Sequence, residues 1–426
     1  MKKIFTTVFM AACVLAAAAQ TVSTVSEEMQ LLGESMSPNC KYVVGTNYMT
    51  FAPAMWLVEG NSYVNFTELE EGQFHAVSNN GLAVGSKTYA VKANLDGTWS
   101  ELYADKGELI EEDWGSYYTG EAGSDAWGIT PDGSIIVGDY FDANYLTRPC
   151  LWIGDKRVDL PLPDADAVPF AFDGAGARFI SDDGKVVLGY LNDDFGLWPA
   201  CIWRQNEQGE YECDPISKDY FETEPGQGKP FMTFEGRGLS GNGEWITLVV
   251  SPEYDMWNWE EPTIKCARYN LNTKQMDVYG DGSQVISLYG IANDGTAVGF
   301  EDHGMMFGRK GAIWYPGQEK PAMFSELFPG NEYFEANTGD MGCNAPGYIT
   351  PDGKHIQGFA MTNDDNMDIT SYIVDTPDKP TAINDITVES SNNNVVKGAY
   401  DLTGRRVNEN SLTHGIYIID GKKVVK

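Results

Sequence analysis

Basic residues and histidines are scarce in this chain. Lys and Arg number 29 against 62 Asp and Glu, which gives a net charge of −33 at pH 7, and there are four histidines. Nucleic acid needs a basic surface against its phosphates, so this composition excludes it as a partner. No His-Glu-x-x-His or Gly-x-Ser-x-Gly sequence occurs. A zincin or a serine hydrolase of those types is therefore not predicted.

Long apolar runs are missing beyond the start of the chain. The run that begins at Ile4 follows two lysines and ends in Ala17-Ala18-Ala19, which is the pattern of a secretory signal. We predict that residues 1–19 are a signal peptide. No later run reaches the roughly 18 residues that span a bilayer. We therefore expect no transmembrane span, and we expect the mature protein to be secreted or held at the cell surface.

Cysteine is also sparse, with six residues beyond the predicted signal. An even count in an exported protein permits disulfides. However, Cys150 and Cys201 occupy a position that Ala54 and Ala312 fill in other copies of the repeat described next. Equivalent positions in neighbouring repeats should lie too far apart for the Cα separation of about 4.4–6.8 Å that a disulfide needs. We expect small buried thiols between the repeats.

The chain is rich in one repeated hairpin sequence. Residues 128–138 read Gly-Ile-Thr-Pro-Asp-Gly-Ser-Ile-Ile-Val-Gly, in which two β-prone runs flank a Pro-Asp-Gly turn. Related sequences occur seven times, and their turns begin at Ser37, Ser78, Thr130, Ser181, Ser240, Ala292 and Thr350. Six steps cover the 313 residues from Cys40 to Gly353, a mean period of about 52. A period near 50 that is built from short strands predicts a propeller.

A second sequence, a small residue two positions before an aromatic one, follows most hairpins. It reads Ala54-Met55-Trp56, Cys150-Leu151-Trp152, Cys201-Ile202-Trp203, Ala267-Arg268-Tyr269 and Ala312-Ile313-Trp314. A polar turn and a fourth strand come next, so each repeat makes one blade. The predicted fold class is all-β: a seven-bladed β-propeller of four-stranded blades over residues 20–375, plus a small C-terminal β tail.

The seventh repeat lacks a fourth strand of its own. Two prolines within residues 375–380 break strand pairing there. Residues 21–25, just after the predicted signal, are largely β-branched and belong to no repeat. We predict that they supply the missing strand and close the ring, which protects an otherwise open sheet edge.

The end of the chain has a different character. Residues 376–382 read as a linker, and residues 383–426 carry Tyr400-Asp401-Leu402-Thr403-Gly404-Arg405 followed by Gly415-Ile416-Tyr417-Ile418. Two or three alternating strands are expected, too few for a stable domain alone. This pair of motifs resembles the C-terminal sorting tails of the type IX secretion system of Bacteroidetes. The resemblance implies that the secretion machinery is a partner; a working signal, a retained anchor and a remnant all fit the short tail.

The repeats themselves resemble the extracellular propeller repeats called HAF repeats and the TolB-like repeats with their Ser-Pro-Asp-Gly turn. The similarity covers about residues 28–375. The chain has no Gly-Gly pair and no Trp-Asp dipeptide, so kelch and WD40 repeats are not supported.

Carboxylates and aromatic residues concentrate in the connections between the second and third strands, which share one face of a propeller. Flat aromatic rings can stack on sugar rings while Asp and Asn bind the hydroxyls. The residues predicted to bind ligand are Tyr140, Asp194, Trp198, Asp255, Trp257, Trp259, His303 and Asp364. Residues 101–127, with Trp114, Tyr117 and Tyr118, are predicted to form a long functional loop on the same face.

We therefore predict a non-enzymatic module that binds an extracellular ligand, with a glycan as the first candidate and no catalytic residue assigned. One alternative is a carbohydrate-active enzyme, a hydrolase or lyase, with carboxylates paired about 5–10 Å apart. The other is a protein-interaction platform whose partner is a surface protein. The same carboxylates make Ca²⁺ a candidate cofactor. Residues 364–368 begin like a calcium loop, but Ile369 stands where that loop needs glycine, so no metal site is assigned.

Overall fold

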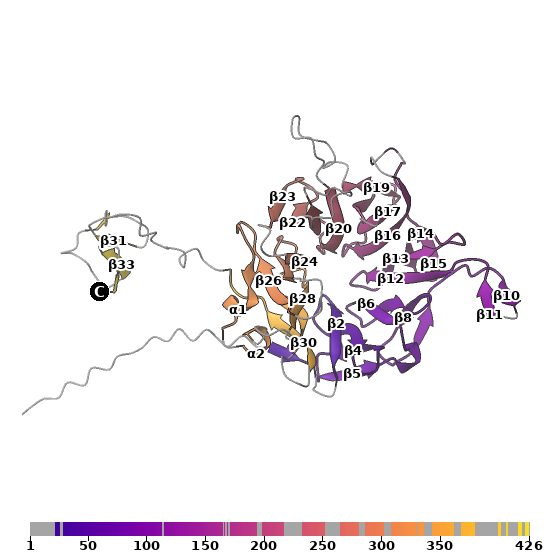
Figure 1. The fold of residues 1–426 in the computed structure, drawn as a ribbon, viewed down its shortest axis with the longest axis horizontal. Helices are drawn as coiled ribbons and strands as arrows, with labels where there is room; N and C mark the ends of the chain where they lie inside the picture. Colours follow the sequence, from indigo (N-terminus) through magenta and orange to yellow (C-terminus); the bar gives the residue numbers. More distant parts are fainter. Residues whose placement is uncertain are drawn as a thin grey trace, which may run out of the picture. The chain divides into compact units, whose positions relative to one another are not determined.

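Seven four-stranded antiparallel sheets form a ring in the computed structural model of the chain (Figure 1). The structure describes residues 22–25, 29–112, 115–164, 166, 168, 171–193, 198–216, 232–251, 265–280, 286–301, 308–329, 331–335, 343–361, 368–379, 399–401, 406–407, 416–419 and 422–425. The chain divides into two units, Met1–Pro377 and Asp378–Lys426. The first unit is the seven-bladed β-propeller that the repeat period predicts.

Each blade uses four strands that are consecutive in the sequence, except for the last blade. The first blade consists of β2 (Leu31–Met36), β3 (Tyr42–Asn47), β4 (Ala52–Leu57) and β5 (Ser62–Asn65). The second consists of β6 (Gln73–Val77), β7 (Ala83–Ser86), β8 (Ala90–Ala93) and β9 (Trp99–Glu101). The third consists of β12 (Gly123–Ile129), β13 (Ile135–Phe141), β14 (Thr147–Ile153) and β15 (Lys156–Asp159). The fourth blade consists of β16 (Phe172–Ile180), β17 (Val186–Asp193), β18 (Ala200–Gln205) and β19 (Tyr211–Pro215). The fifth consists of β20 (Met232–Leu239), β21 (Trp245–Ser251), β22 (Lys265–Asn270) and β23 (Met276–Tyr279). The sixth consists of β24 (Ile286–Ile291), β25 (Ala297–Glu301), β26 (Lys310–Trp314) and β27 (Ala322–Met323).

The seventh blade joins the two ends of the propeller. It consists of β28 (Cys343–Ile349), β29 (His355–Met361), β30 (Ile369–Asp375) and, at its outer edge, β1 (Val22–Thr24). β1 runs antiparallel to β30 with Ser23 opposite Ile373, and the Val25 N–H donates to the Ser371 carbonyl at 3.1 Å. The prediction that residues 21–25 supply the missing strand and close the ring is confirmed for Val22–Thr24.

The Ser/Thr and Asp/Asn positions of the repeat organise one face of the disc, which we call the turn face. In the third blade the Thr130 hydroxyl donates to Asp132 Oδ1 at 2.7 Å, and Gly133 takes a φ of 78° that favours glycine. The turns also bond to one another across blades, because the Asn79 N–H donates to the Pro131 carbonyl at 2.8 Å. The repeated turn therefore links neighbouring blades as well as the strands of its own blade.

Tryptophans of the third strands fill the space between blades. Trp56, Trp152, Trp203 and Trp314 are all fully buried, and the Trp203 indole N–H donates to the Pro161 carbonyl at 2.7 Å. Cys150 and Cys201 are buried on the same strands, and all six cysteines of the described chain are free thiols. Burial raises the pKa of both thiols well above the ordinary value, so these side chains stay protonated and pack as small apolar groups.

Several local expectations are wrong. Residues 101–127 are not a continuous loop, because β10 (Leu109–Glu112) and β11 (Gly115–Tyr118) form a separate hairpin. Tyr140, which was expected in the connection between the second and third strands, lies inside β13, as does the neighbouring Asp139. Among the described residues, the otherwise all-β unit also has short helical turns at η1 (Thr67–Leu69), α1 (Phe324–Leu327) and α2 (Glu332–Glu335).

The second unit is a small sheet of its own. β31 (Ala399–Asp401), β32 (Arg406–Val407), β33 (Ile416–Ile419) and β34 (Lys422–Val425) pair in the order β32-β31-β33-β34. The described residues of this unit therefore form four strands, where two or three were expected. Across both units, the described helices include none that could cross a membrane.

Candidate ligand-binding cavity and loop face

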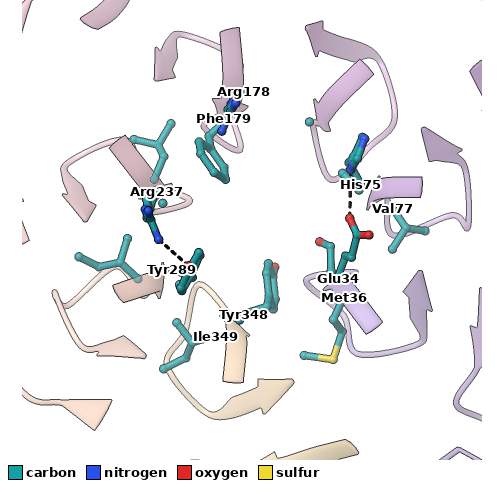
Figure 2. Close-up of a pocket in the computed structure, with 18 of the residues that line it drawn as sticks. Glu34, Met36, His75, Val77, Arg178, Phe179, Arg237, Tyr289, Tyr348 and Ile349 are labelled. Atoms are coloured by element: carbon teal, nitrogen blue, oxygen red, sulfur yellow. Dashed lines mark hydrogen bonds and ion pairs between the residues drawn. The ribbon is translucent and has the colours of Figure 1, made fainter. Parts of the chain in front are cut away.

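Every innermost strand carries a β-bulge at the same point, three residues before the first residue of its turn. A bulge leaves one residue without a partner on the neighbouring strand and redirects its side chain. The residues at these seven positions are Glu34, His75, Trp127, Arg178, Arg237, Tyr289 and Gly347, and we call them the charged layer. All seven line one cavity of about 480 Å³ at the centre of the disc (Figure 2). Small-molecule pockets commonly span about 300–1,000 Å³.

The cavity changes from polar to apolar along its axis. Two residues after each bulge, toward the turn face, every blade contributes an apolar side chain; these form the apolar floor and are Met36, Val77, Ile129, Ile180, Leu239, Ile291 and Ile349. Between the two layers most positions are Gly, Ala or Ser, but Phe179 and Tyr348 are large. The cavity therefore joins charged groups at one level to a hydrocarbon surface at the other.

On one side of the charged layer His75 is held between two carboxylates. Its Nδ1 lies 3.0 Å from Glu34 Oε2 and its Nε2 lies 3.4 Å from Asp125 Oδ1. The imidazole stacks on the Trp127 ring at 4.0 Å between centroids, and the Arg178 guanidinium lies 4.8 Å from that ring. Burial lowers the pKa of His75, but the hydrogen bonds to the two carboxylates outweigh it and raise the pKa to about 9. His75 is therefore a cation at neutral pH.

On the other side two arginines share one carboxylate. Arg178 Nη1 and Arg237 Nε both contact Glu235, the latter at 3.4 Å from Oε2. Arg237 Nη1 donates to the Tyr289 hydroxyl (Figure 2), and the Tyr289 ring stacks on Phe300 at 4.8 Å. Contacts thus pass from blade to blade around the cavity from Glu34 to Tyr289.

In the seventh blade the bulge residue is Gly347, which contributes no side chain to the charged layer. A Cβ atom added there would meet only the Glu34 carbonyl oxygen, at 3.9 Å. The space that a side chain would fill is therefore part of the cavity. It lies at the same level as the two arginines.

Cations gather at the cavity although the protein is strongly acidic. His75, Arg178, Arg237 and Arg309 line it together with the carboxylates Glu34 and Asp182, and the carboxylates of Asp125 and Glu235 contact three of these cations. The whole sequence has nine arginines, and three of them are here. Behind the lining, burial and the nearby Asp125 charge raise the pKa of Asp139 to about 8, so this carboxyl group is protonated at neutral pH.

Exposed aromatic residues stand on the face opposite the turns, which we call the loop face. Phe51, Tyr145 and Trp198 lie in the connection between the second and third strands of the first, third and fourth blades, and they are 63%, 77% and 41% exposed. Their φ angles are 53°, 61° and 47°, a left-handed conformation that is unfavourable for bulky residues. The Trp198 ring lies 5.9 Å from the Arg178 guanidinium, so it borders the charged layer.

Two of the residues predicted to bind ligand are described by the structure. Trp198 is an exposed loop-face residue, as expected, whereas Tyr140 is on β13 with the Arg157 guanidinium 3.7 Å from its ring. Tyr140 does not line the cavity. The other six predicted residues lie outside the described part of the chain, and they are Asp194, Asp255, Trp257, Trp259, His303 and Asp364.

The charged layer was missed from the sequence. A signal for it exists: in six of seven repeats the residue three before the start of the turn is charged or aromatic, in a strand otherwise rich in Gly, Ala and aliphatic residues. Within the described residues no group of three or more His, Cys, Asp or Glu is arranged to hold a metal ion. Residues 364–367 of the candidate calcium loop are not among them.

No protein-family model matches the sequence. No curated protein matches it either. Among solved structures, the chain is similar to oligogalacturonate lyase from Vibrio parahaemolyticus, with 13% identity, a TM-score of 0.46 and coverage of 84% of this chain and 98% of that one. Similarity to TolB from Acinetobacter baumannii has 13% identity, a TM-score of 0.37 and coverage of 84% and 64%. Similarity to hydrazine synthase from Kuenenia stuttgartiensis has 12% identity, a TM-score of 0.44 and coverage of 80% of this chain and 96% of that one. Values this low say nothing about the ligand or activity of this chain.

Proposed function

We propose that the protein is a secreted or cell-surface binding module that recognises an extracellular glycan on its loop face. The observation that carries the proposal is the set of exposed aromatic residues Phe51, Tyr145 and Trp198, each in a left-handed backbone conformation at the same kind of connection. Strained, exposed aromatic residues are unfavourable for folding alone and cluster at sites of recognition. Their flat rings suit the apolar faces of sugars.

Trp198 is the best placed of the three. Its ring lies 6.0 Å from the Tyr190 ring and 5.9 Å from the Arg178 guanidinium, which limit its motion on one side. A ring that is already positioned loses little conformational freedom when a ligand binds. The neighbouring guanidinium can donate hydrogen bonds to sugar hydroxyls.

Binding without turnover is favoured over glycan cleavage. Of the carboxylates around the charged layer, Glu34 contacts His75 and Glu235 contacts two arginines. A glycoside hydrolase needs one carboxyl group as an acid and a second as a base or nucleophile. Both carboxylates are engaged by cations, so neither is positioned as a free general acid.

Export and attachment complete the proposal. Residues 1–19 would direct secretion, and residues 383–426 would engage the secretion machinery through their sorting-type motifs. In this proposal Ca²⁺ is an optional cofactor of the loop face, tested by repeating the binding measurements with a chelator.

Trp198→Ala should reduce glycan affinity about tenfold, which corresponds to the loss of one aromatic contact. The measurement is binding to a panel of immobilised polysaccharides, with released sugars assayed in parallel. Tyr63→Ala is the matched control, because Tyr63 is an exposed aromatic residue on an outer strand. Equal losses in both variants, or sugar release by the wild type, would contradict the proposal. Binding of a surface protein but of no glycan would favour the interaction platform.

A further inference from the structure

We infer that the central cavity is a second binding site, which takes a small organic monocarboxylate with an apolar body. This inference goes beyond the glycan proposal and does not depend on it. The juxtaposition that carries it is a pair of guanidinium groups that share one carboxylate, in a layer next to a floor of aliphatic side chains.

Two arginines that share one carboxylate favour an anion. Arg178 and Arg237 both contact Glu235, and both belong to the cavity lining. One carboxylate does not fully neutralise two half-buried guanidiniums, and an incoming carboxylate can. Guanidinium groups bind carboxylates through two parallel hydrogen bonds.

The apolar floor favours an anion that carries a hydrocarbon body. The bulge residues and the floor residues are two positions apart on each strand, which corresponds to about 7 Å at about 3.3 Å per residue. This is the length of a four- to six-carbon chain or one aromatic ring. Sugars suit such a floor poorly, because their hydroxyls would lose hydrogen bonds there.

The open position at Gly347 gives the carboxylate room. It adjoins Glu34 and lies in the same layer as Arg237 and Tyr289. In the next layer the Tyr348 side chain points into the cavity (Figure 2).

The net charge restricts the size of the anion. A chain of net charge −33 repels polyanions at long range. A small monoanion experiences much less repulsion, and the two guanidinium groups that share Glu235 can offset it. We therefore exclude acidic polysaccharides from this site.

The test is isothermal titration of the full mature chain with hexanoate and benzoate. Hexanamide keeps the apolar body without the charge, and acetate keeps the charge without the body. We expect hexanoate and benzoate to bind at least tenfold more tightly than hexanamide or acetate. No binding of either hexanoate or benzoate, or equal binding of hexanamide, would overturn the inference.

Variants at two positions place the binding in the cavity. Gly347→Leu fills the open position without changing charge and should weaken hexanoate binding at least tenfold, whereas Gly347→Ala should have little effect. Arg237→Gln should also weaken it at least tenfold, in contrast to Arg148→Gln at an arginine that is paired with Asp142 outside the cavity. Circular dichroism and thermal unfolding check that each variant is folded. Unchanged affinity in folded Gly347→Leu would overturn the inference.

Trp198→Ala separates the two proposals. It should weaken glycan binding and leave hexanoate affinity within about twofold, because Trp198 does not line the cavity. Loss of hexanoate binding in this variant would show that the cavity is not a separate site.

Discussion

A chain that begins at Ser26 should unfold at a lower temperature than one that begins at Gln20, and it should self-associate. The shorter chain lacks β1, whose residues pair with Val374, Ile373 and Tyr372 of β30. It also lacks Val25, which is buried in a cluster between the first and last blades. Without β1 the edge of β30 is unpaired, and an unpaired edge is a template for another chain.

The expected loss is about 3 kcal/mol, from the burial of Val25, the lost strand pairing and the ordering entropy that offsets them. For a propeller of about 350 residues this corresponds to about 4 °C in unfolding temperature. Scanning calorimetry measures the shift, and size-exclusion chromatography with light scattering measures the association. Identical unfolding temperatures and a strictly monomeric truncated chain would show that β1 contributes nothing to ring closure.

Ring closure was predictable because its signals are local. Prolines in residues 375–380 end the last repeat one strand short, and β-branched residues 21–25 belong to no other element. The turns were predictable for the same reason: the Thr130 hydroxyl and the Asp132 carboxylate that define the motif contact each other directly at 2.7 Å. Seven similar copies then leave a closed ring of sheets as the arrangement that buries every blade.

The cavity was not predictable in the same way because its residues do not repeat. The bulge positions hold Glu, His, Trp, Arg, Arg, Tyr and Gly in successive blades, so no motif identifies them. Side chains of a regular strand alternate between its two faces, and a bulge shifts this alternation by one residue. A sequence pattern that assumes regular alternation therefore assigns a bulge residue to the wrong face of the sheet. Only the three-dimensional ring brings Glu34 beside His75 and Arg237 beside Tyr289.

The length of individual strands was a separate source of error. The repeated sequence of the third blade ends at Gly138, but β13 continues to Phe141. The register continues past it, with Asp139 opposite Pro149 and Tyr140 opposite Arg148. Backbone pairing with β14 therefore extends the strand beyond its local signal. That extension places Asp139 in the interior and Tyr140 under Arg157.

The second large effect concerns pH. The folded protein holds a proton on His75 to about pH 9, whereas an unfolded histidine releases it near pH 6.5. The contribution of the His75 contacts to stability is therefore complete below about pH 6.5 and is lost as the pH rises to about 9. At about 1.4 kcal/mol per unit of pKa difference it amounts to about 3 kcal/mol, or about 4 °C.

The Asp139 carboxyl group also lowers the stability of the folded state as the pH rises. Its pKa is raised to about 8, so the folded state keeps this proton while the unfolded carboxyl group has ionised. Stability therefore falls further between about pH 4 and 8. The charged groups that face the pair are Glu34, Asp125 and Arg178. Asp139→Asn should remove the part of the loss of stability that occurs between about pH 4 and 8.

His75→Gln isolates the contribution of the imidazole. The wild type should be more stable than this variant by about 3 kcal/mol at pH 6, and the difference should vanish near pH 9.5, because a neutral imidazole and a neutral amide then face the same two carboxylates. His355→Gln is the matched control, since His355 contacts Asp375 at 3.0 Å from a half-exposed position. Thermal unfolding from pH 5 to 10 measures both differences. A His75→Gln difference that stays constant with pH would mean that the two carboxylates do not hold a proton on His75 in the folded state.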